Sequence, residues 1–271
     1  MATRGPARRE PVRPAGGRRL SVLAFVGLVV VYLIVLHGLA LILTSGLVTR
    51  YAAPGTLNEM WRGITLPEAV SVVLVVAVIS WLRWWPPVLR DDRPVQRWVV
   101  VVPVGMAACA VVVTDYAALA GKGAAFTLTL LLSAALIGVG EELMFRGLGV
   151  TVFRANGFRE GMVALWSTVI FAVAHAANLL TEGAGAFVQV LTTMVAGYFL
   201  YLIRRRSGGI AVPAVIHAMW DFSLISGQVN PDRPYPLSLL AIVTMVVLAI
   251  VVLVRRHHIE PTPVTGPGRV R

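Results

Sequence analysis

The sequence is poor in charged residues and almost devoid of cysteine. Only 14% of its 271 residues are charged, and Cys109 is the single cysteine. One thiol excludes both an internal disulfide and a cysteine-based metal cluster. We find no internal repeat and no glycine-rich phosphate-binding loop, since Gly121-Lys122-Gly123 lacks the required spacing. Chemistry must therefore come from a few ionisable side chains set among apolar ones.

Apolar residues make up 57% of the chain, and the mean hydropathy is +0.78. These values are typical of a polytopic membrane protein. Because each span needs ~20 residues, the length allows about eight of them. Six uncharged runs cover 20–43, 98–114, 123–140, 161–181, 183–203 and 234–254, and two weaker ones cover 63–82, with Glu68, and 207–230, with Asp221. We predict an all-α membrane helical bundle of about eight transmembrane helices.

The distribution of arginine predicts the topology and the domain organisation. Residues 1–19 form an Arg-rich tail, 20–256 a single membrane domain with a core at about 124–226, and 257–271 a flexible tail. With the amino terminus inside, most Lys and Arg residues fall on the cytoplasmic side, which predicts two cytoplasmic termini in a bacterial plasma membrane. The net charge of +11 then reflects topology and attraction to the lipid bilayer, with no nucleic acid as partner.

The first polar cluster is Glu141-Glu142-Leu-Met-Phe-Arg146, well inside an apolar run. Residues four apart share a helix face, whereas adjacent residues diverge by ~100°. Glu142 is therefore expected to pair with Arg146, which leaves Glu141 to face a cavity as a general base. The alternative is that the cluster only marks the cytoplasmic end of the fourth span.

Two further clusters contribute histidines. Phe171 precedes His175 by one helical turn, and His217 precedes Asp221 by one turn. A neutral imidazole can ligate a metal, accept a proton or donate to a developing oxyanion. Counting residues from the expected boundaries places His175 nearer the outer half of the membrane than Glu141 and His217. A long fourth helix, tilt or a late start of the fifth span would reconcile these depths.

These three clusters resemble the motifs of the CPBP family, also called ABI, which includes type II CAAX prenyl proteases. The pattern is Glu-Glu-x-x-x-Arg, Phe-x-x-x-His and His-x-x-x-Asn or Asp, and the resemblance covers about residues 124–226. It implies an intramembrane endopeptidase. In the family's scheme Glu141 and His175 activate water, His217 and Asp221 stabilise the oxyanion, and Glu142 and Arg146 shape the site. Asp221 departs from the Asn of eukaryotic members and has to be protonated to donate a hydrogen bond.

The sequence is compatible with two forms of catalysis, one with a divalent metal and one without. Glu141, His175 and His217 form a set of the kind that holds a catalytic divalent metal such as zinc. We favour a glutamate-activated water without metal, because no His-Glu-x-x-His pair is present.

The expected substrate is a membrane-embedded or lipidated hydrophobic peptide, and processing, signalling and bacteriocin immunity all remain open as roles. Two other functions stay as alternatives. One is a non-catalytic immunity or scaffold protein. The other is a proton-coupled transporter that uses Asp115, Glu141, Glu142 and Asp221 as a relay.

Overall fold

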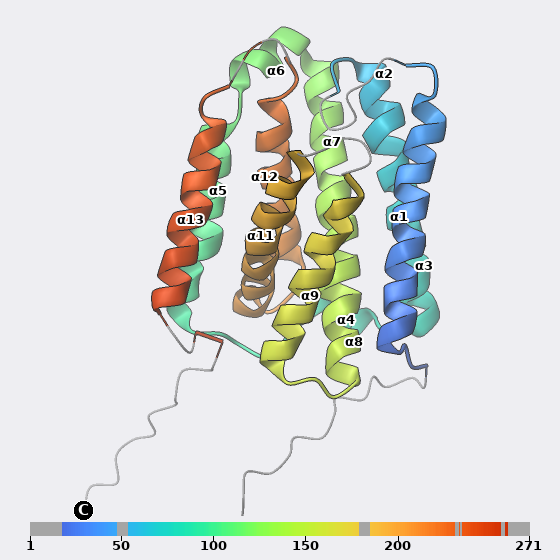
Figure 1. Cartoon of the computed structure of the whole chain (residues 1–271), viewed down its shortest axis with the longest axis vertical. Coiled ribbons are helices and arrows are strands. Elements are labelled where there is room, and N and C mark those ends of the chain that lie inside the picture. The colour runs from blue at the N-terminus through green and yellow to red at the C-terminus, as the bar shows by residue number, and fades with distance from the viewer. Residues whose placement is uncertain are drawn as a thin grey trace, which may run out of the picture.

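The computed structural model describes residues 18–47, 54–178, 185–230, 233, 235–255 and 258–259, and these form a helical bundle (Figure 1). No strand occurs among the described residues, so the predicted all-α class is confirmed. Most of the two predicted tails, 1–19 and 257–271, lies outside the described residues.

The helices follow one another with short connections. Their bounds are α1 (Val22–Thr44), α2 (Leu57–Met60), η1 (Trp61–Thr65), α3 (Leu66–Leu82), α4 (Trp85–Leu89), η2 (Arg97–Val100), α5 (Val101–Val113), α6 (Tyr116–Lys122), α7 (Ala124–Glu141), η3 (Glu142–Gly149), α8 (Val150–Ala155), α9 (Glu160–Ala174), η4 (His175–Asn178), α11 (Gly185–Ser207), α12 (Ala211–Ser226) and α13 (Ser238–Val254). Two of these elements, η1 and η3, are π-helical and interrupt otherwise α-helical rods.

Five helices of the described part are long and apolar enough to cross a membrane. A sixth crossing results if the bent pair Arg97–Val113 and Tyr116–Lys122 counts as one span. The remaining apolar helices, α12 with 16 residues and α13 with 17, are shorter than the ~20 residues of a full span. The predicted count of about eight is therefore not confirmed, and the fold is that of a multi-pass membrane protein.

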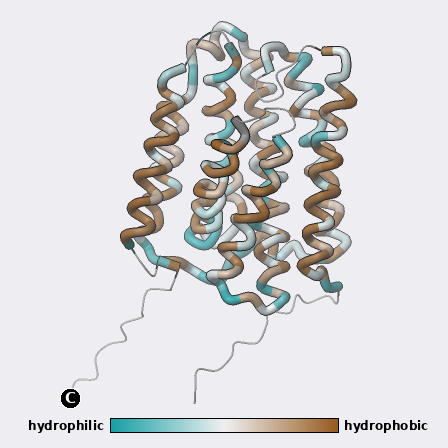
Figure 2. Tube along the Cα trace, viewed as in Figure 1, coloured by the Kyte–Doolittle hydropathy of each residue, from teal (hydrophilic) through white to brown (hydrophobic). Residues whose placement is uncertain are grey.

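The outer surface of the bundle is apolar. Leu23, Ile42, Leu191 and Leu253 are each at least 67% exposed, which fits contact with lipid tails. Hydrophilic residues gather at the two ends of the bundle, as Figure 2 shows. The start of α1 and the end of α13 lie at the same end (Figure 1). The cytoplasmic placement of both termini stays a prediction.

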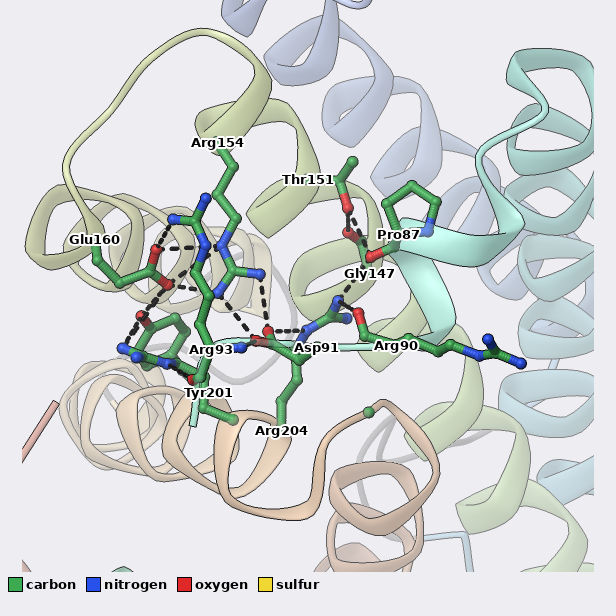
Figure 3. Close-up of polar contacts among 12 residues, drawn as sticks. Pro87, Arg90, Asp91, Arg93, Gly147, Thr151, Arg154, Glu160, Tyr201 and Arg204 are labelled. Atoms are coloured by element: carbon green, nitrogen blue, oxygen red, sulfur yellow. Dashed lines mark hydrogen bonds and ion pairs between the residues drawn. The ribbon is translucent and has the colours of Figure 1, made fainter. Parts of the chain in front are cut away.

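An ion-pair network fastens the connection between α4 and η2 at this same end of the bundle (Figure 3). The Asp91 carboxylate, which is fully buried, accepts hydrogen bonds from Arg154 Nη1 at 2.9 Å and from Arg204 Nε at 3.0 Å. Glu160 accepts from the Tyr201 hydroxyl at 2.6 Å and pairs with Arg154 at 2.5 Å. The network joins α8, α9 and α11 to one loop.

Replacement of Asp91 by Asn should destabilise the protein, because it leaves the Arg204 guanidinium buried without its anion and leaves Arg154 with only the Glu160 carboxylate. Removing one partner of a buried pair costs about 3–5 kcal/mol. Burial alone would raise the pKa of Asp91, but the charges and hydrogen bonds of Arg154 and Arg204 hold that pKa below its usual value. A lowered folded-state pKa stabilises the fold above the unfolded-state pKa of ~3.9, and this stability is lost as pH falls through the folded-state value.

The measurement is thermal unfolding in detergent as a function of pH. Wild type should lose stability on acidification below pH ~4, the unfolded-state value for Asp, while the Asp91→Asn variant starts lower and loses less over that range. Asp92→Asn, at the exposed neighbouring residue, is the matched control and should behave as wild type. Equal pH profiles for the Asp91 and Asp92 variants would contradict this role.

Candidate active site

The first motif lies at a change of helix type. Glu141 is the last residue of α7, and Glu142 begins the π-helix η3. The pairing of Glu142 with Arg146 was predicted from α-helical spacing, whereas the structure places both residues in a π-helix. The small size of Gly147 and Gly149 allows close packing here, because a Cβ atom would lie 2.8 Å from Val88 Cγ1 or 3.0 Å from Phe25 Cζ, respectively. Short π-helical segments in α-helices are frequent at functional sites.

The predicted pair of Glu142 and Arg146 forms. Arg146 Nη1 donates to Glu142 Oε1 at 2.7 Å, and both side chains are fully buried. The guanidinium also donates to the Gly197 carbonyl at 3.1 Å and stacks on the Phe171 ring, with 3.8 Å between Arg146 Cζ and the ring centroid. The phenylalanine of the second motif is thus a platform for the arginine of the first.

A close crossing of α7 and α12 brings the first and third motifs together. A Cβ atom on Gly138 would lie 2.5 Å from the Ala214 carbonyl oxygen and 2.9 Å from the Ala218 amide nitrogen, so only glycine fits. Gly138 lies one turn before Glu141, and Ala214 and Ala218 flank His217. The backbones therefore approach closely enough for these side chains to meet.

His217 is the centre of the polar cluster. Its Nδ1 lies 3.0 Å from Glu142 Oε1, so Glu142 contacts both Arg146 and His217. The other ring nitrogen, Nε2, lies 3.6 Å from Glu141 Oε2 and 3.4 Å from Asp221 Oδ2. The sequence assigned Glu142 to Arg146 alone, whereas the structure shows that it also orients the histidine.

His175 approaches from another helix. It caps the carboxyl end of α9, and its Nδ1 is 2.9 Å from the Phe171 carbonyl oxygen. Since Nδ1 then carries the hydrogen, Nε2 is left to act as an acceptor. The Phe171 ring lies edge-on to both imidazoles, with centroids 4.8 Å from His175 and 5.8 Å from His217.

The expected mismatch in depth does not arise, because the fourth helix is long. The rod Ala124–Ala155 has 32 residues and is followed after a short turn by α9, which begins at Glu160. Glu141 and His175 lie almost the same number of residues from this turn, in opposite directions along the chain. At 1.5 Å per residue they reach the same level. Of the three solutions considered, a long fourth helix applies.

Two cavities adjoin the cluster. The first, which we call the acidic cavity, has a volume of about 230 Å³ and is lined among others by Tyr32, Glu68, Glu141, His175 and Asp221. The second, the apolar cavity, has a volume of about 370 Å³. It is lined mainly by apolar side chains of α5, α11, α12 and α13, including Met106, Leu200, Trp220 and Met245, and by His175, His217 and Asp221. His175 and Asp221 therefore line both cavities.

The ligand set suggested for a metal is not gathered in this structure. No group of three or more His, Cys, Asp or Glu side chains is arranged to hold a metal ion within the described part of the chain. His217 Nε2 faces Glu141 and Asp221, and His175 does not complete a group with them. The residues as placed do not fit a metal centre.

Several residues outside the three motifs also contribute to the site. Glu68 on α3 and Tyr32 on α1 line the acidic cavity. The only sequence signal for Glu68 was an acid in an otherwise uncharged predicted span, and Tyr32 gave none. By contrast Asp115, considered for a proton relay, caps α6 through the Ala118 amide and pairs with Arg233 at 2.5 Å. Asp115 lines neither cavity.

The three motifs lie in a segment that matches a known protein family. Residues 123–223 match the model of a family described as type II CAAX prenyl endopeptidase Rce1-like. This segment contains all three motifs, so the resemblance named from them is confirmed, and the match supports an enzyme of the CAAX protease type. No curated protein and no solved structure matches the chain.

Proposed function

We propose that this membrane protein, whose residues 123–223 match the prenyl endopeptidase family, hydrolyses a peptide bond within a membrane-associated, lipidated or hydrophobic peptide. The observation that carries the proposal is the cluster itself. Glu141, Glu142, His217 and Asp221 meet at membrane depth, and Glu141, His175 and Asp221 line one cavity. Ionisable groups are costly in a bilayer and persist where they pair or act on a substrate.

The proposed base is Glu141 acting with His175. Glu141 Oε2 makes no hydrogen bond within the described part of the chain, and the Nε2 atom of His175 is an acceptor. A water between them gives up a proton as its oxygen attacks the substrate carbonyl carbon. The same proton then goes to the amide nitrogen as the C–N bond breaks, so the products are a carboxylic acid and an amine.

His217 and Asp221 are the proposed oxyanion stabilisers. Glu142 fixes the His217 ring through Nδ1, and a ring that carries hydrogen on both nitrogens can donate from Nε2 to the developing negative charge. Asp221 lies beside Nε2 at 3.4 Å and either orients this donor or, when protonated, donates a second hydrogen bond. Arg146 holds Glu142 in place by donating to the same oxygen, Oε1, that His217 Nδ1 contacts.

The test is cleavage in proteoliposomes. Purified protein is mixed with a panel of single-span and lipid-modified peptides in ¹⁸O-labelled water, with EDTA present, and the products are analysed by mass spectrometry. We expect a discrete cut that introduces one labelled oxygen into the new carboxylate, and the His175→Gln variant should lose this activity. No cleavage above the His175→Gln background for any peptide would contradict the proposal.

A further inference from the structure

Glu68 and Tyr32 carry unpaired polar atoms in the interior of the bundle. Glu68 is 5% exposed and Tyr32 is 1% exposed. Neither Glu68 Oε2 nor the Tyr32 hydroxyl makes a hydrogen bond within the described part of the chain. An unpaired polar group in an apolar interior costs several kcal/mol, roughly 2–7 for an uncharged one. Such groups at membrane depth indicate a site that binds a polar part of a substrate.

Both oxygen atoms point to the same place, beside the proposed base. A Cβ atom on Gly140 would lie 3.7 Å from the Tyr32 hydroxyl and 3.9 Å from Glu68 Oε2. Gly140 directly precedes Glu141, and all three polar side chains line the acidic cavity. Residues from α1, α3 and α7, remote in sequence, therefore converge on one wall of the site.

A helix-capping role does not explain Glu68. It lies well inside the continuous 26-residue helix Leu57–Leu82, where no free backbone amides require an anion. The π-helix η1 ends just before it, and the π-helix η3 begins just after Glu141. Both interruptions thus occur where these two helices border the acidic cavity, which fits a functional more than a structural origin.

The charge and size of the acidic cavity indicate what it can hold. Glu68, Glu141 and Asp221 contribute three carboxyl groups, and no Lys or Arg is among the described residues that line it. Attraction between opposite charges is strong where water is scarce. A volume of about 230 Å³ accommodates one long side chain, since a water molecule takes ~30 Å³.

We infer that the acidic cavity is a specificity subsite that binds a cationic Lys or Arg side chain of the substrate next to the cleaved bond, through Glu68 and Tyr32. This inference rests on the proposed function. A cation held there places the neighbouring peptide bond beside Glu141 and fixes which bond is cut. The hydrophobic part of the substrate remains available to the apolar cavity on the other side of His175 and Asp221.

The test compares peptides that differ at one position. Each position flanking the cut carries Lys or its uncharged analogue norleucine, and kcat/KM is measured for wild type, Glu68→Gln and Tyr32→Phe. At one of these flanking positions, the kcat/KM of wild type should be ~10-fold higher for Lys than for norleucine, which is the effect of one charge-assisted hydrogen bond. Glu68→Gln should abolish this preference, because it lowers kcat/KM on the Lys peptide by ~10-fold more than on the norleucine peptide. Tyr32→Phe should reduce the preference.

A binding measurement separates this inference from the proposed function. The affinity for the same peptides, carrying a label, is measured in the Glu141→Gln variant with and without Glu68→Gln. This binding measurement does not require turnover. A Lys preference that disappears with Glu68→Gln supports the subsite even if wild type cleaves nothing. Cleavage or binding without any Lys preference, or an equal loss on both peptides in Glu68→Gln, would overturn the inference and leave the proposed function standing.

Discussion

Replacement of Glu141 by Gln should reduce kcat by about 10²–10⁴-fold, the usual contribution of a general base. The amide has nearly the same shape but cannot take a proton from water at neutral pH. Its contacts are few, because Oε2 makes no hydrogen bond within the described part of the chain and His217 Nε2 lies 3.6 Å away. The fold should therefore persist. Initial rates on the peptide cleaved best by wild type, with thermal unfolding in parallel, provide the measurement.

Glu59→Gln is the matched control for this substitution. Glu59 is a glutamate on α2 that accepts from the Gly55 amide and lines neither cavity. The control should keep the wild-type rate. A Glu141→Gln variant that is folded and cleaves at the wild-type rate would mean that another group activates the water.

Replacement of Arg146 by Met should have a large effect on stability. It leaves Glu142 fully buried without its cation, and the loss of one partner of a buried pair costs about 3–5 kcal/mol. The contacts with the Gly197 carbonyl and the Phe171 ring are lost as well. Thermal unfolding should shift down by at least ~6 °C, since 1 kcal/mol corresponds to ~2 °C in larger domains.

The double variant Glu142→Gln/Arg146→Met separates charge from packing. It removes both charges and should recover much of the lost stability, because no unpaired ion remains in the interior. Activity should stay low, since His217 has lost the carboxylate that fixes its Nδ1. If the double variant were as unstable as Arg146→Met alone, the cost would come from packing against Phe171 and not from an isolated charge.

The sequence was informative wherever function depends on local spacing. The four-residue offset of Glu142 and Arg146 predicted their ion pair, and the three motifs predicted the family match. The contact of Glu142 with His217 could not be predicted, because it depends on the close crossing of α7 and α12 at Gly138. Spacing within one helix can be predicted from the sequence, whereas the point at which two helices cross depends on how both of them pack.

The other features that the sequence did not predict also depend on packing between segments that are remote in sequence. Gly147, in the π-helix η3, packs closely on Val88 from a segment remote in sequence, and such a contact has no signal in local spacing. Glu68 and Tyr32 reach the site through the packing of α1 on α3 and of α3 on α7. Hydropathy indicated the apolar segments, but α12 and α13 are shorter than the apolar runs 207–230 and 234–254, so the number of crossings did not follow from hydropathy.

The central claim is that Glu141 and His175, on different helices, act on one water molecule. A double-mutant cycle with Glu141→Gln and His175→Gln tests it most directly, because groups that act as a unit are not additive. We expect the double variant to cleave as slowly as either single variant, within about 3-fold. Once one member of a catalytic unit is removed, removal of the second costs little more. Rate losses that multiply in the double variant would contradict a shared water and the proposed mechanism.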